Sequence, residues 1–105
     1  MTLPKLILEL SISQITHFRA DSNYTIIHTR NGREVVSGYS LKTFQELLRQ
    51  KNFVRIDRSY LVHRSFILNS NFTSDTAYIT LRNAEEIIIP RRKRNFLKNL
   101  LTKTI

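Results

Sequence analysis

The pair Asn31-Gly32 lies between two segments in which apolar and polar residues alternate, and it constrains the fold more than any other local feature. Asn and Gly tolerate the positive φ values that both central positions of a type I′ turn require, and this turn is the favoured two-residue connection of a β-hairpin. The sequence therefore predicts that residues 24–30 and 33–37 are antiparallel strands joined by a type I′ turn.

Other segments show the same alternation, which places one face of a strand against a core. The further predicted strands are residues 5–15, 15–20, 53–55, 66–69, 76–81 and 86–89, and residues 59–62 are either a strand or a helical turn. Residues 21–23 are a predicted turn, because Asp, Ser and Asn side chains bond nearby backbone groups. Residues 82–85 are predicted to close a second hairpin, whose last strand Pro90 ends because proline has no ladder donor.

Two segments have the spacing of amphipathic helices. Ser40 is a natural N-cap for a helix over residues 41–50. From Arg91 onward an apolar stripe predicts a C-terminal helix that packs on the core. The stripe consists of Phe96, Leu97, Leu100 and Leu101. The predicted fold class is mainly β with short helices, and the length of 105 residues predicts that residues 1–105 form a single domain.

The charge balance favours a polyanionic partner. There are 17 Lys and Arg against 8 Asp and Glu, which gives a formal net charge of +9. The last acidic residue is Glu86, so the C-terminal segment that follows it carries only positive charge. Such an asymmetry favours nucleic acid over a basic surface that is merely soluble.

The first group of cations lies within residues 53–67, where Arg55, Arg58 and Arg64 alternate with aliphatic and aromatic residues. Arginine presents paired donors to phosphate or guanine, and loops at the ends of a sheet can carry it into a groove. Arg58 is therefore a candidate contact to a base or a phosphate, and the alternative is an ion pair with neighbouring Asp57. Arg55 is predicted to have a structural role.

The second group is the run Arg91, Arg92, Lys93 and Arg94 at the start of the predicted C-terminal helix. The helix macrodipole is already positive there, so four cations are unfavourable unless an anion is bound. The alternative is an exposed basic helix face in contact with water alone. The dipole argument favours phosphate binding.

Little in the chain supports catalysis, a cofactor or a metal site. The three histidines are scattered, cysteine is absent, and two glycines cannot form a glycine-rich phosphate loop. The adjacent carboxylates Glu85 and Glu86 would point to opposite faces of a strand. The apolar run at residues 6–8 is far shorter than the roughly 20 residues of a membrane span. We expect a cytoplasmic protein that is not an enzyme and that requires no cofactor, metal or membrane.

Four segments together carry a resemblance to a known family. They read ITHFRADSNY at residues 15–24, YSLKTF at 39–44, FVRIDRSYLV at 53–62 and IIPRR at 88–92. Their order resembles the LytTR-type DNA-binding domain, the output module of many bacterial response regulators. The similarity covers most of residues 6–101, and the run Arg-x-x-Arg-Ser-Tyr-Leu-Val after a capped helix is its most specific part.

The resemblance implies an elongated arrangement of several small β-sheets in which loops, not a recognition helix, enter successive major grooves of DNA. By this resemblance the first contact loop contains Asn23 and Tyr24, the second Arg58 and Ser59, and the third Arg91 and Arg92. Electrostatics adds Lys93 and Arg94 for attraction to the DNA backbone. Arg58, Arg91 and Arg92 are the expected base or phosphate contacts, while Asn23, Tyr24 and Ser59 are expected to position the protein.

The chain departs from the family pattern at four positions. Ser22 replaces the usual glycine, Asp57 a common His, His63 a common Asn, and Pro90 a usual Ser. Family members usually also carry an N-terminal receiver domain, for which this chain has no room. We therefore expect a stand-alone regulator or a C-terminal domain, with any receiver domain or sensor kinase outside this chain.

The leading hypothesis is sequence-specific binding of double-stranded DNA in bacterial transcription regulation, with two copies on repeated half-sites. One alternative is an anionic membrane-surface or protein-interaction module in which the apolar stripe of the C-terminal helix inserts or docks. Another is single-stranded RNA binding, in which bases stack on Tyr24, Tyr39 and Tyr60.

Overall fold

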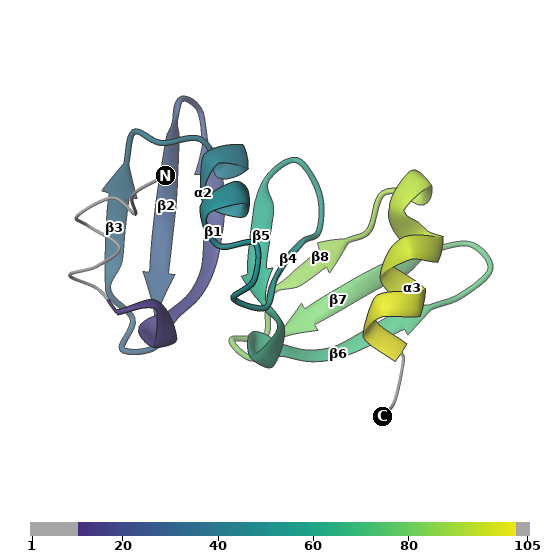
Figure 1. Cartoon of the computed structure of the whole chain (residues 1–105). Coiled ribbons are helices and arrows are strands. Elements are labelled where there is room, and N and C mark those ends of the chain that lie inside the picture. The colour runs from purple at the N-terminus through teal and green to yellow at the C-terminus, as the bar shows by residue number, and fades with distance from the viewer. Residues whose placement is uncertain (1–10, 103–105) are drawn as a thin grey trace. The chain divides into compact units, whose positions relative to one another are not determined.

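The chain folds into two compact units, Met1–Arg64 and Ser65–Ile105. The structure is a computed structural model that describes residues 11–102 (Figure 1). Within that range, the first unit has a five-stranded sheet and the second a three-stranded sheet, and all strand pairs are antiparallel. The predicted fold class, mainly β with short helices, is confirmed.

The first unit is one sheet with strand order β3-β2-β1-β5-β4 and a single α-helix among its described residues. Its elements are the 3-10 helix η1 (Ile12–Gln14), strands β1 (Ile15–Asp21), β2 (Tyr24–Thr29) and β3 (Glu34–Ser37), helix α2 (Leu41–Leu47), and strands β4 (Phe53–Arg55) and β5 (Tyr60–His63). The segment predicted as either strand or helical turn is thus a strand. It pairs with the N-terminal strand of the sheet, far away in sequence.

The second unit is a meander with strand order β6-β7-β8, followed by a helix. After the 3-10 helix η2 (Arg64–Phe66) come strands β6 (Ile67–Phe72), β7 (Ala77–Leu81) and β8 (Glu86–Ile88), the 3-10 helix η3 (Arg91–Lys93) and helix α3 (Arg94–Thr102). Strand β8 ends at Ile88, one residue before its predicted limit at Ile89, and the Pro90 carbonyl that follows accepts the Lys93 backbone N–H at 2.9 Å.

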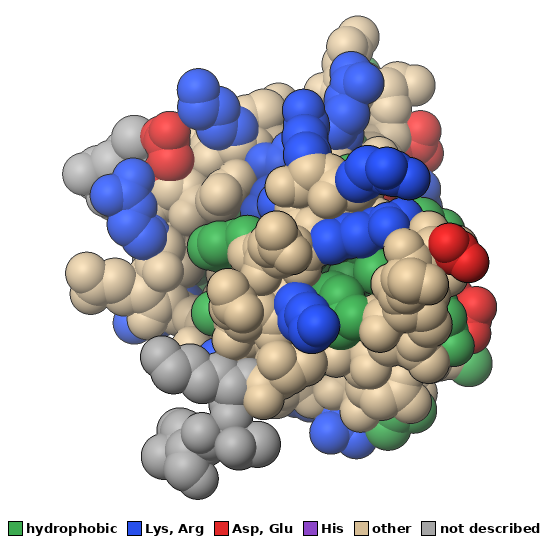
Figure 2. Space-filling model, turned by 90° about the vertical axis from the view of Figure 1, so that its right-hand side faces the viewer, with side chains coloured by type: hydrophobic (Ala, Val, Ile, Leu, Met, Phe, Trp, Pro, Cys, Tyr) green, Lys and Arg blue, Asp and Glu red, His purple; other side chains and the backbone are tan. Residues whose placement is uncertain are grey.

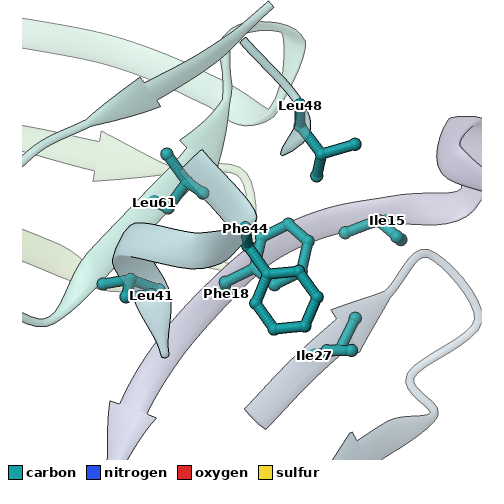
Figure 3. Packing of buried hydrophobic residues seen from close by; sticks show 7 residues of the cluster. All are labelled: Ile15, Phe18, Ile27, Leu41, Phe44, Leu48 and Leu61. Carbon is teal, nitrogen blue, oxygen red and sulfur yellow. The ribbon is translucent and has the colours of Figure 1, made fainter. Parts of the chain in front are cut away.

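Helix α2 packs on one face of the five-stranded sheet, as Figure 3 shows. The Phe18 and Phe44 rings stack with centroids 4.7 Å apart, and both side chains are fully buried. A bulge in β1 between Ile15 and His17 breaks the period of two, so that Ile15 and Phe18 join the same cluster although they are three residues apart. Leu41 and Leu48 complete the helix side of this core.

The predicted strand over residues 5–15 and the predicted helix over residues 41–50 need correction at their limits. In the predicted strand over residues 5–15, residues 5–10 lie outside the described part, and Ile12–Gln14 forms a 3-10 helix instead. Helix α2 begins at the predicted N-cap, where Ser40 accepts the Thr43 N–H at 3.1 Å, but it ends at Leu47 rather than at residue 50. It ends early because Leu48 leaves the helical region with φ −109°.

The predicted type I′ turn is wrong, although the hairpin is present. Gly32 has φ 85°, but Asn31 is not among the positive-φ residues, whereas a type I′ turn needs both. The Gly32 N–H bonds the Thr29 carbonyl at 3.0 Å, and the Thr29 N–H bonds the Arg33 carbonyl at 3.0 Å. This is a three-residue loop with a left-handed glycine. The Asn31 side chain decides the outcome, because its Oδ1 accepts the Arg33 N–H at 3.0 Å.

The second hairpin uses the same loop with a different residue at the left-handed position. Asn83 Oδ1 accepts the Glu85 N–H at 3.0 Å, and the Ala84 N–H bonds the Leu81 carbonyl at 2.9 Å. Ala84 has φ 75°, where the first hairpin has Gly32. Because a Cβ atom makes this conformation unfavourable, Ala84 is strained and Gly32 is not.

The C-terminal helix forms, but its apolar stripe is not uniformly buried. Leu97 is fully buried, and Leu100 and Leu101 are half-buried. Phe96 is 62% exposed, so the prediction that it belongs to the core stripe is wrong. Phe96 and Leu97 are adjacent, so their side chains point about 100° apart, and the helix turns Leu97 rather than Phe96 toward the core.

Exchanging the residue at the left-handed position should change stability in opposite directions in the two hairpins. Gly32→Ala should lower the free energy of unfolding by about 1 kcal/mol, and Ala84→Gly should raise it by up to about 1 kcal/mol. The new Cβ in Gly32→Ala would meet no atom within 4 Å, so the change isolates the backbone effect. Urea unfolding of both variants measures it. Changes of the same sign in both loops would contradict this account.

Candidate nucleic-acid interface

The first predicted contact loop is the tight turn between β1 and β2. Ser22 has φ 54°, a left-handed conformation that glycine adopts at less cost than a residue with a Cβ atom. Asn23 is exposed and Tyr24 is 57% exposed. The turn thus presents an amide and a phenol to the surface, where both are available for hydrogen bonding or stacking.

The second predicted loop connects β4 to β5 and is held by a carboxylate. Asp57 Oδ1 accepts the backbone N–H groups of Ser59 at 2.8 Å and Tyr60 at 2.9 Å. Arg58 is exposed, and within residues 11–102 it forms no ion pair with Asp57. The alternative of an Arg58–Asp57 ion pair is therefore wrong, because the carboxylate binds backbone amides instead.

Arg55 braces the same loop from the other side. Its Nε donates to the Asp57 carbonyl at 2.6 Å and its Nη2 to the Arg58 carbonyl at 3.2 Å, while Nη1 donates to Gln45 Oε1 of helix α2 at 2.8 Å. Burial lowers the pKa of Arg55 from its ordinary value, and the Asp57 charge opposes that shift. The predicted structural role of Arg55 is confirmed.

The first two loops meet at one hollow of about 380 Å³ in the first unit. Asn23, Tyr24 and Arg58 all line it, together with Arg55. Its other lining residues are Ala20, Ser22, Thr25, Ser40, Leu41 and Lys42. The fold therefore gathers residues that are more than thirty positions apart in sequence into one basic surface feature.

Sequence reasoning missed Lys42 as part of this hollow. Lys42 is exposed in the first turn of α2, two residues after the Ser40 cap, and its sequence position is that of an ordinary solvated helix residue. The one sequence feature that could have indicated a role for Lys42 is its position close to a helix N-terminus, where a cation is electrostatically unfavourable unless an anion is present.

The third predicted segment lies in the second unit, in η3 and at the start of α3. Arg91 and Arg92 are exposed, and Lys93 and Arg94 are half-buried. Arg94 Nε is buried and has no hydrogen-bond partner among the described residues. Figure 2, which views the protein from the side of α3, shows many Lys and Arg side chains at the surface and few acidic ones. The exposed Arg91 and Arg92 are accessible to a polyanion.

Two histidines stack on each other on the neighbouring strands β1 and β2. The rings of His17 and His28 stack with centroids 4.2 Å apart, and His17 Nδ1 lies 2.9 Å from the Thr16 hydroxyl. Burial, followed by repulsion from His28 and Arg19, lowers the pKa of His17 to about 3. Burial, followed by repulsion from Arg30, also lowers the pKa of His63. His17 is therefore a neutral packing group near pH 7.

The described residues offer no metal centre and no membrane span. No group of three or more His, Cys, Asp or Glu in the described range is placed to hold a metal ion. None of the helices found between residues 11 and 102 has the length and apolarity needed to cross a bilayer.

Comparisons with known proteins agree with this geometry. The model of the LytTr DNA-binding domain family matches residues 5–102. A solved LytTr DNA-binding domain from Bacillus cereus, described as part of a methyl-accepting/DNA response regulator, is similar in fold with a TM-score of 0.74. The two sequences are 23% identical, and the match covers 87% of this chain and 84% of the other. No curated protein matches significantly.

Asp57 should stabilise the β4–β5 loop as a hydrogen-bond acceptor more than through its negative charge. Asp57→Ala removes the acceptor of two backbone N–H groups and should cost about 1 to 2 kcal/mol in free energy of unfolding. Asp57→Asn keeps Oδ1 as an acceptor and should cost less. Urea unfolding and hydrogen exchange at the Ser59 and Tyr60 amides measure both effects. Equal losses in the two variants would refute a hydrogen-bonding role.

Acidification should destabilise the protein through His17. The folded pKa of about 3 lies below the ordinary 6.5, so between these values the unfolded chain binds a proton that the folded chain does not. Stability is therefore fully present above pH 6.5 and is lost as the pH falls toward 3, by about 1.4 kcal/mol per pH unit for one proton. Urea unfolding between pH 7 and 5 should show a flatter dependence for His17→Gln. An unchanged slope would exclude His17 as the source.

Proposed function

Because this chain belongs to the LytTr DNA-binding domain family, whose general function is DNA binding in transcription regulation, we propose that it binds specific double-stranded DNA sequences through its loops. The family is not an enzyme family, and we propose no catalytic activity for this chain. The two compact units would act together as one DNA-binding domain over residues 1–105. The loops would enter the major groove, where each base pair presents a distinct pattern of donors and acceptors.

The observation that carries this proposal is the hollow shared by the first two loops. Arg58 is exposed on a loop whose backbone is fixed by Asp57 and Arg55, and it lines the same hollow as Asn23 and Tyr24. A rigid loop loses little conformational entropy when it binds, so its contacts contribute more fully to affinity and specificity. In this arrangement Arg58 contacts a base or a phosphate, and the other loop residues, Ser59 included, position the backbone.

Arg91 and Arg92 supply the third set of contacts. Both are exposed in the short 3-10 helix that follows Pro90. Arginine forms bidentate hydrogen bonds with guanine, the commonest specific contact in the major groove. We assign base or phosphate contact to these two residues, and attraction to the DNA backbone to Lys93 and Arg94, which follow them.

The assembly around the DNA is also part of the proposal. Two copies of the chain would occupy repeated half-sites, and a receiver domain or sensor kinase, if one controls the protein, would lie outside this chain. Selection of binding sites from a random duplex library tests both specificity and half-site number. An enriched motif that occurs twice at a fixed spacing is the expected result. A selected pool without any motif would overturn sequence-specific binding.

A second candidate function draws on the exposed Phe96. This side chain is 62% exposed on a helix that also carries Arg94 and Lys98, a combination that could dock on an anionic membrane surface or on a protein. The RNA-stacking alternative has less support, because Tyr60 is half-buried with its ring 6.3 Å from that of His17. Flotation with anionic liposomes, compared with duplex binding at the same salt concentration, separates the membrane alternative from DNA binding.

Two neighbouring substitutions should affect DNA binding differently. Arg92→Ala should cost about 1 to 3 kcal/mol on the selected sequence and relax the preference at one base position. Lys93→Ala should weaken binding to all sequences about equally. It should also reduce the slope of log affinity against log salt by the amount expected for about one phosphate contact. Affinities of both variants for selected and random duplexes, measured over a range of salt concentrations, check this. Equal losses on both duplexes for Arg92→Ala would refute its assignment as a base contact.

A further inference from the structure

The second unit has a hollow that the contacts assigned above do not explain. Its volume is about 340 Å³, and it lies between the β6–β7 loop and the start of α3. The lining residues are Phe72, Thr73, Ser74, Arg94, Asn95 and Lys98. Two cations, two hydroxyl groups and one amide line this hollow, and no carboxylate does. Such a set of donors matches an anion with several acceptor oxygens.

The two cations are placed unfavourably unless an anion lies between them. Arg94 and Lys98 are four residues apart on α3, so they lie on the same helix face, where like charges destabilise a helix. Arg94 Nε is also buried without a hydrogen-bond partner among the described residues. A buried donor of a charged group that lacks a partner is costly. A bound anion would remove both penalties at once.

The β6–β7 loop is fixed in a form that leaves one hydroxyl group free for a ligand. The Thr73 hydroxyl donates to the Thr76 carbonyl at 2.8 Å and accepts the Thr76 N–H at 3.0 Å, which closes the loop on itself. Ser74 follows, is exposed and lines the hollow. Asp75 belongs to the same loop but does not line the hollow, so the lining keeps its positive charge.

We propose that this hollow binds one phosphate group, with Arg94 and Lys98 supplying charge and with Ser74 and Asn95 donating hydrogen bonds. The phosphate has two sources with the same chemistry, a phosphodiester of the DNA backbone and a free phosphate ion. As a DNA contact, the site rests on the function proposed above and adds Ser74, Asn95 and Lys98 to it. As a site for free phosphate, it is independent of DNA binding.

The first arm of the test uses inorganic phosphate alone. Amide resonances of the full chain are followed by NMR during titration with phosphate, against chloride at the same ionic strength. We expect saturable shifts at Ser74, Asn95 and Lys98 that are specific to phosphate and that Lys98→Gln abolishes. Lys51→Gln is the matched control, because Lys51 is an exposed lysine that lines neither hollow.

The second arm uses the DNA obtained by selection. Lys98→Gln should weaken selected and random duplexes alike, and should reduce the slope of log affinity against log salt by about 0.9, the value for one phosphate. Lys51→Gln should leave that slope unchanged. Thermal melting confirms that both variants are folded, as expected for exposed lysines.

The outcomes separate the two proposals. A changed salt slope assigns the hollow to a phosphate of the DNA backbone, and phosphate-specific shifts without a changed slope assign it to free phosphate. If the unmodified chain shows no phosphate-specific shifts and folded Lys98→Gln leaves the salt slope unchanged, the site is overturned. Failure of the selection to enrich a motif overturns sequence-specific binding instead, while the phosphate titration still decides whether the hollow holds an anion.

Discussion

The stacking of Phe18 on Phe44 is the contact on which the first unit depends. It joins the central strand β1 to helix α2, with both rings fully excluded from water and centroids 4.7 Å apart. Burying two aromatic side chains contributes more than almost any other pair in so small a core. Because Ser40 and Lys42 at the start of α2 line the hollow beside the first two loops, this contact also positions part of the candidate interface.

A shared hydrogen-bonding device makes three of the loops rigid. In each, the Oδ1 atom of an Asn or Asp accepts the backbone N–H two residues later, at 3.0 Å for Asn31 and Asn83 and at 2.8 Å for Asp57. The side chain replaces a missing backbone partner, so the loop holds its shape without a regular ladder. Two of these loops close hairpins, and the third presents Arg58. A loop with a mobile backbone would lose more entropy on binding than this loop does.

The arrangement of the cations makes the folded chain less stable alone than when it is bound to a polyanion. The net charge is +9, and the Arg19–Asp21 pair has its charged groups 4.0 Å apart. Asp57 and Arg55 bind loop backbone rather than each other, and Arg94 and Lys98 share a helix face. Repulsion within an excess of positive charge costs stability, and association with phosphate groups recovers it.

Local chemistry in the sequence determined the Ser40 cap, both hairpins, the basic C-terminal helix and the mainly β class, because each depends on residues only a few positions apart. The resemblance named the residues of the contact loops, and the exposure of Arg58, Arg91 and Arg92 agrees with it. Tertiary structure decided what depends on distant partners. It made residues 60–63 a strand by pairing them with β1, left Phe96 in solvent by turning α3 toward Leu97, and brought Lys42 to the Arg58 loop. Periodicity shows which faces of an element differ, but only packing selects the face that is buried.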